Sequence, residues 1–319
     1  MSTKVDLVSS TMIPGDTAPA SRPFTKSDPQ HPAPSERRRS TEGLELRLNQ
    51  RYGSAASQSP RFEDQRGTAT LEGLLSHRSV RRYLQQPLEP GTLELLIAAA
   101  QSAASSSNLQ LWSVVNVEDP ELRQALSSLA GDQAHVRSAP LFLVWVADLH
   151  RASELARLRG LPDDGLNYLE SLLVASVDAA LAAQNAVVAA EALGLGTVYI
   201  GALRNHPDHV AALLGLPRHA FAVFGLCVGW PDPAAAAPVK PRLPQAVVVH
   251  HERYRFAEQE HAQVEEYDQL MQRFYASQQM PVPEGGWSWH SARRFASAAA
   301  LNGRHLLREA LARLGFELR

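Results

Sequence analysis

The chain has 319 residues, of which 45% are apolar and 20% charged, and its formal net charge is −2. This length allows one good-sized hydrophobic core, and the near-neutral charge gives no overall field that would attract nucleic acid or an anionic membrane. The single cysteine, Cys227, excludes an intramolecular disulfide, and the apolar run around it predicts a small buried side chain. Because no apolar leader or spanning segment is evident, we expect a cytoplasmic protein with a small-molecule partner.

Residues 1–68 are rich in Ser, Pro, Arg and Gln and show little hydrophobic periodicity. Prolines recur too often for an extended helix or strand, so we expect a disordered N-terminal extension. The arginines at 37–39 are expected to be solvated charge in this tail.

Order is predicted from residue 69, with a core over residues 69–250 and a helical extension of the same domain over residues 251–319. Leucines at helical spacing begin the core at residue 71, and a second helix is predicted over Thr92–Ala104. Pro120 fits the first turn of another helix, which Asp119 would cap. Four apolar, β-rich runs lie between helical patterns: Trp112–Val117, Leu141–Ala147, Thr197–Ile200 and Ala222–Val228. This alternation predicts a mixed α/β layered domain.

The segment Tyr168–Leu193 has apolar or small residues almost all round, which predicts a helix that is buried by neighbours on every side. Asp178, Gln184 and Asn185 interrupt its apolar surface too often for a membrane span, so a subunit interface is the better interpretation. After this core, helices are predicted over 256–278 and 288–314, separated by a break rich in Pro and Gly.

Three short polar segments carry groups suited to phosphate or ring-nitrogen contacts: His77 to Arg82 (HRSVRR), Ser105 to Gln110 (SSSNLQ), and Lys240 to Arg242 (KPR). Arginine offers a rigid fork of donors that matches phosphate oxygens, and serine hydroxyls add donors at short reach. Between the second and third segments lies Gly194 to Ala202 (GLGTVYIGA), whose glycines would let the backbone approach a flat ligand. Its spacing does not fit the GxGxxG pattern, so a Rossmann site is not supported.

In this order the motifs resemble the nitroreductase family, and within it the branch that contains the major oxygen-insensitive nitroreductases and flavin reductase P. The resemblance implies an α+β layered core in which helices flank a central mixed sheet, and a long buried central helix. It also implies a homodimer in which the C-terminal helical extension wraps around the partner subunit. Deletion of residues 1–60 is then expected to leave dimer and activity intact.

The resemblance also implies an FMN site and the residues that form it. Arg78, Ser79, Lys240 and Arg242 would bind the phosphate end, and Arg81 would approach the pyrimidine edge of the flavin. The remaining implied cofactor contacts are His77, Ser105, Ser106, Ser107, Gln110, Gln133, Tyr199, Ile200, Gly201 and Ala202, with the Gly201 N–H near the flavin N5. Glu170 and Asn108 would lie on the substrate side, and Asn108 stands where the family usually has an aromatic residue.

The implied activity is FMN-dependent oxidation of NADPH, with NADH possible, and two-electron ping-pong reduction of nitroaromatics, quinones or similar small-molecule acceptors. The cofactor would carry the reaction, so no catalytic side chain is expected. A flavin reductase that supplies reduced FMN, and a non-enzymatic flavin-sequestering or sensing protein, are the alternatives. The histidine groupings lack a convergent third ligand, so no metal is expected. Taken singly, the arginine run would be a surface helix cap, the serine run a loop, and Glu170 a residue favoured by the helix dipole.

Overall fold

The computed structural model describes residues 44, 46–53, 68–235, 237–256, 258–278, 280–281 and 284–319. Most of the extension predicted over residues 1–68 lies outside these residues, including the arginines at 37–39. Residues 46–52, within the range expected to be disordered, instead form a helical segment in which Leu48 is buried. A piece of the extension therefore packs on the domain.

One four-stranded sheet forms the centre of the fold, in the order β1-β2-β4-β3. Its strands coincide with the four apolar runs of the sequence: β1 Trp112–Asn116, β2 Leu141–Asp148, β3 Gly196–Ile200 and β4 Ala220–Gly229. The family resemblance implies a mixed sheet. The four strands pair antiparallel, and a parallel pairing occurs at an isolated bridge between Ser79 and Thr197.

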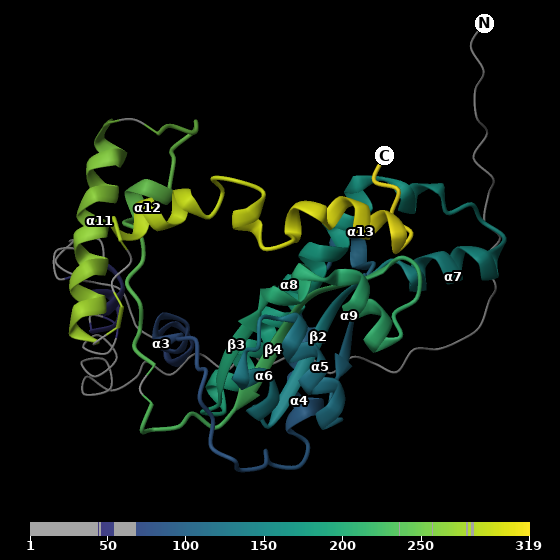
Figure 1. Ribbon diagram of the computed structural model, residues 1–319, viewed down its shortest axis with the longest axis horizontal. Helices are drawn as coiled ribbons and strands as arrows, with labels where there is room; N and C mark the ends of the chain where they lie inside the picture. Colours follow the sequence, from purple (N-terminus) through teal and green to yellow (C-terminus); the bar gives the residue numbers. More distant parts are fainter. Residues whose placement is uncertain are drawn as a thin grey trace, which may run out of the picture.

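Helices cover both faces of the sheet, and β2 is therefore buried on both sides (Figure 1). Phe142 and Val144 pack against one hydrophobic cluster, and Leu143 and Trp145 pack against the other. The first face is covered by α5 (Pro120–Leu129), α6 (Ala134–Ser138) and α9 (Pro207–Leu214), and the second by α4 (Thr92–Gln101) and α8 (Leu169–Ala192). The expected N-cap of α5 is confirmed, since the Asp119 carboxylate accepts from the Glu121 N–H at 2.9 Å. The shorter elements are α3 (Ala69–Ser76), α7 (His150–Arg159), α10 (Gln245–Val248) and the 3₁₀ turns η1 (Ser106–Asn108), η2 (Asp164–Asn167) and η3 (Gly201–Asn205).

Helix α8 has one buried face and one exposed apolar stripe. Its alanines at 179, 182, 183 and 186 are fully buried against the sheet and α4. On the opposite face Leu169, Leu173, Val177 and Leu181, four residues apart, are 43–57% exposed. By length and composition α8 could cross a membrane, but it is the core helix of a layer and carries the buried, hydrogen-bonded Asp178.

The C-terminal part leaves the sheet as α11 (Glu258–Ser277) and α12 (Gly286–Arg293) and returns to it as α13 (Leu307–Arg313), where Leu311 is buried (Figure 1). The single helix predicted over residues 288–314 is wrong. Short 3₁₀ turns, η4 (Ala299–Leu301) and η5 (Arg304–Leu306), separate α12 from α13. Asn302 and Gly303 are left-handed, with φ of 51° and 85°, and a Cβ on Gly303 would lie 2.8 Å from the Asn205 carbonyl oxygen. A side chain at position 303 would therefore clash with Asn205, and this close approach requires glycine.

Candidate functional site

The HRSVRR motif crosses the edge of the sheet where β3 begins and β4 ends. Ser79 bridges Thr197, and the Val80 N–H donates to the Thr197 carbonyl at 2.8 Å. Gly196 is required here, because a Cβ at this position would lie 2.5 Å from Val80 Cγ2. The glycine therefore lets the motif lie directly against β3.

The segment that follows β4 forms the opposite wall. The Asp232 N–H donates to the Arg82 carbonyl at 3.1 Å, which ties this segment to the HRSVRR motif. Further along, the Tyr267 hydroxyl of α11 donates to the Pro241 carbonyl at 3.0 Å. The Lys240 ammonium lies 5.6 Å from the centre of the Tyr275 ring on the same helix. Helix α11 thus supports the Lys-Pro-Arg tripeptide.

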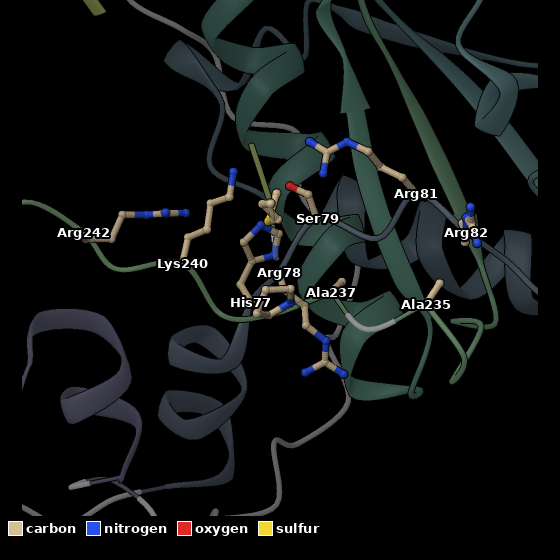
Figure 2. Close-up of a pocket in the computed structure, with 11 residues that line it drawn as sticks. His77, Arg78, Ser79, Arg81, Arg82, Ala235, Ala237, Lys240 and Arg242 are labelled. Atoms are coloured by element: carbon tan, nitrogen blue, oxygen red, sulfur yellow. The ribbon is translucent and has the colours of Figure 1, made fainter. Parts of the chain in front are cut away.

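These two walls enclose a cavity of about 410 Å³. Figure 2 shows Lys240 and Arg242 on one side of it, Arg81 and Arg82 on the other, and Ser79 between them. The residues that line it are His77, Arg78, Ser79, Arg81, Arg82, Ala235, Ala237, Pro238, Lys240, Arg242 and Met280. Five of these are Lys or Arg, and no carboxylate is among the described residues that line the cavity. Such a donor set suits an anion with several oxygens.

Burial, and then the crowding of positive charge, lower the pKa values of cations at this site. Burial lowers the pKa of the Lys240 ammonium, and the nearby guanidinium groups of Arg81 and Arg242 lower it further. Arg51, packed behind the cavity, has a pKa lowered by burial and then by Arg242. A bound anion would relieve this repulsion.

His77 is fixed at one end of the cavity by an acidic partner from α8. Its Nδ1 lies 2.6 Å from Glu191 Oε1, and both side chains are largely covered. This contact fixes the imidazole ring and anchors the start of the motif to the end of α8.

The serine segment lies elsewhere in the subunit and does not line the cavity. Asp178, which is 1% exposed, holds it in place. The carboxylate accepts from Ser105 Oγ at 2.7 Å and from the N–H groups of Ser106 and Leu111, each at 3.1 Å. Three residues of this loop are left-handed: Ser107, Asn108 and Gln110.

The other predicted contact residues are likewise separate from the cavity. Gln133 donates to the Ala130 carbonyl at 2.8 Å in the turn before α6, and Glu170 is exposed at the start of α8. The Tyr199 hydroxyl donates to Gln184 at 3.3 Å, and Ile200 is 1% exposed. Gly201 and Ala202 open η3 at the end of β3. Thr197, which bridges Ser79, and Gly201 lie at opposite ends of the same strand segment. At ~3.3 Å per strand residue they are about 13 Å apart.

Four residues at or around the site were not predicted from the sequence, and a fifth, Arg82, was named only as part of the HRSVRR segment. Arg82 and Met280 line the cavity, whereas Arg51, Glu191 and Asp178 hold its parts or the serine loop in place. Asp178 and Glu191 carried a signal, because each is an acidic residue within an apolar helix. Arg51 carried none, since it lies in a segment that composition predicts to be disordered.

Comparison with known proteins adds independent information. The family model "Nitroreductase family" matches residues 74–230, and "Nitroreductase family, C-terminal domain" matches residues 240–319. An oxygen-insensitive NADPH nitroreductase of Salmonella typhimurium is 41% identical over 224 residues, which are 70% of this chain and 90% of that protein. An NADPH-flavin oxidoreductase of Vibrio harveyi is 42% identical over 69% of this chain and 88% of that protein.

A solved structure, the NADPH:FMN oxidoreductase from Vibrio harveyi complexed with NAD⁺, superposes with a TM-score of 0.70 at 37% identity. The superposition covers 79% of this chain and all of that one. The two family models, the relatives and the superposed structure all assign the described core to one family. The chain therefore belongs to the nitroreductase family.

Proposed function

We propose that this protein is an FMN-dependent NAD(P)H oxidoreductase that passes two electrons from a nicotinamide to a small-molecule acceptor. The observation that carries the proposal is the cavity lined by five cationic side chains. Relatives with at least 37% identity are named as NADPH nitroreductase, NADPH-flavin oxidoreductase and FMN reductase. A nitroreductase and a flavin reductase would each need a cavity that binds a phosphorylated flavin.

The residues present fit the phosphate end of FMN. A phosphate monoester carries close to two negative charges at neutral pH and presents several acceptor oxygens. Lys240 and Arg242 supply the opposite charge from one wall, and Arg78 lines the other. The Ser79 hydroxyl adds a short donor between Lys240 and Arg81 (Figure 2). The volume of about 410 Å³ lies within the usual range for small-molecule sites.

When bound, the flavin supplies hydride chemistry, so the protein needs no nucleophilic side chain. The chain's own contribution is position and charge. The phosphate-binding side chains named above would anchor the phosphate end of FMN. Gly201, at the far end of β3, would offer its backbone N–H to the flavin ring. Arg81 adds positive charge at the edge of the site. We propose that the serine loop, Gln133 and Tyr199 to Ala202 complete the ring end as the family resemblance implies.

We also propose that the protein is a cytoplasmic homodimer. The stripe of four exposed aliphatic residues on α8 is unusual for a surface that faces only water. In addition, α11 and α12 lie away from the sheet of their own subunit (Figure 1). A second copy that covers both surfaces would account for them, with the C-terminal extension wrapping around the partner.

The proposal is tested by the colour and the reduction of the purified protein. We expect a yellow protein whose flavin is released as FMN and is bleached under anaerobic conditions by NADPH. A panel of nitroaromatics, quinones and free FMN, added to the reduced protein, then identifies the acceptor and separates nitroreductase from flavin-reductase activity. A protein that binds FMN but is not bleached by NADPH or NADH would favour flavin sequestration, and one that binds no FMN would refute the proposal.

A further inference from the structure

Arg51 lies behind the cationic cavity and contacts both of its walls. It is 5% exposed at the end of the helical segment 46–52. Its guanidinium donates three hydrogen bonds to backbone carbonyls: Nε to Leu75 at 2.8 Å, Nη1 to Lys240 at 2.9 Å and Nη2 to His77 at 2.5 Å. In return, the Arg242 N–H donates to the Arg51 carbonyl at 2.7 Å. One residue thus joins segments that lie more than 160 residues apart in the sequence.

These bonds fix the distance between the two halves of the phosphate site. Leu75 and His77 lie at the C-terminal end of α3, where unsatisfied carbonyls favour a cation. Lys240 and Arg242 belong to the opposite wall. A planar guanidinium holds three acceptors in fixed directions, so Arg51 sets how far Arg78 and Ser79 lie from Lys240 and Arg242. Arg51 does not itself line the cavity.

The placement of Arg51 also has an electrostatic meaning. A structural arginine inside a protein usually pairs with a carboxylate, whereas this guanidinium donates its hydrogen bonds to three neutral carbonyls. Burial and then the nearby Arg242 lower its pKa, and Glu191 raises it by less. Its charge adds to the field of the cavity and disfavours the empty state. The arrangement becomes favourable when an anion is bound between the walls.

The helical segment that carries Arg51 lies outside both family matches, the first of which begins at residue 74. Leu48 on this segment and Leu44 just before it are buried, with 5% and 6% exposure, so the segment is anchored by apolar contacts as well. We infer that residues 46–53 contribute to the cofactor site and that Arg51 positions the residues that bind the FMN phosphate. This inference rests on the proposed function.

The test compares phosphorylated and unphosphorylated flavin on the flavin-free full-length protein. FMN and riboflavin are titrated by quenching of flavin fluorescence against wild type, Arg51→Ala and Arg51→Lys. The matched control is Arg47→Ala, which removes the same charge from the same segment and whose side chain, among the described residues, donates a hydrogen bond to Gln50 within that segment. Because Arg51 acts on the phosphate end, Arg51→Ala should raise the Kd for FMN about tenfold or more and change the Kd for riboflavin less than about threefold.

Arg51→Lys should show a smaller loss for FMN of about threefold, since an ammonium lacks the planar fork, and Arg47→Ala should match wild type for both flavins. If Arg51→Ala does not fold, the FMN-to-riboflavin ratio of Arg51→Lys decides the question. An unchanged FMN affinity, or equal losses for FMN and riboflavin, would show that the segment is only structural and would overturn the inference. Wild-type protein that fails to bind FMN would instead refute the proposed function.

Discussion

Replacement of Asp178 by asparagine tests how the serine loop is held. An asparagine side chain has one acceptor oxygen where the carboxylate has two. The Ser106 and Leu111 N–H groups bond different oxygens of Asp178, so whichever way the amide turns, either the buried Leu111 N–H or the part-buried Ser106 N–H loses its acceptor. That loss costs about 1–3 kcal/mol, and each surviving bond loses about 1 kcal/mol of charge assistance. Asparagine is uncharged, so the free-energy cost of burying the carboxylate disappears, which offsets part of the lost hydrogen bonding. The free energy of unfolding should therefore fall by about 2–4 kcal/mol.

The measurement is urea unfolding at one fixed protein concentration, because a dimer's stability depends on concentration. The melting temperature should fall by roughly 5–10 °C in parallel. Asp164→Asn, at an exposed position in η2, is the matched control and should stay within about 0.5 kcal/mol of wild type. A loss for Asp178→Asn no larger than this control would mean that the three hydrogen bonds do not hold the loop.

Three further outcomes follow from the charges and surfaces described. Lys240→Met should weaken FMN binding about tenfold or more yet stabilise the flavin-free protein, because the ammonium has a lowered pKa in the fold. Wild-type apoprotein should accordingly gain stability as the pH rises through the folded pKa towards the ordinary value of 10.5, and thermal melts of the variant should lack this gain. Leu173→Glu, in the exposed stripe of α8, should shift the protein towards monomer in sedimentation, whereas Leu158→Glu, 67% exposed on α7, should not; equal behaviour of the two would argue against this interface. Met280 lines the cavity, and the sequence from 276 to 286 contains no Lys or Arg that could pair with the 2′-phosphate of NADPH. NADPH should therefore be preferred over NADH by tens of fold at most, and a kcat/KM ratio above about a thousand would reveal another cation at the 2′-phosphate.

The layered fold was predictable because its elements follow simple periodicities. All four strands are short apolar runs between helical patterns, and α8 is long and rich in alanine. What sequence patterns missed depends on contacts between distant segments. The break at Asn302 and Gly303 lies where the backbone closely approaches Asn205, and helical periodicity alone gives no sign of a neighbour almost 100 residues away.

The candidate site was predictable in part. Residue chemistry pointed to the HRSVRR and KPR motifs, and the structure brings both to one cavity. The serine loop, Gln133 and the end of β3 carry suitable groups but lie outside that cavity in one subunit, so their role in the site is still a prediction. Spacing along the chain cannot show which motifs converge, because convergence is decided by how the strands and loops pack.

Residues 1–60 show why composition is a poor guide to function at a chain terminus. A segment rich in Ser, Pro and Arg lacks the apolar periodicity of an independent element, so its deletion is expected to be harmless. Residues 46–53 need no core of their own, however, because Leu48 enters a surface that the domain already provides. Arg51 then finds three carbonyls that the domain leaves available. A deletion of residues 1–60 removes these contacts from behind the phosphate site, and we therefore expect it to weaken FMN binding rather than to be neutral.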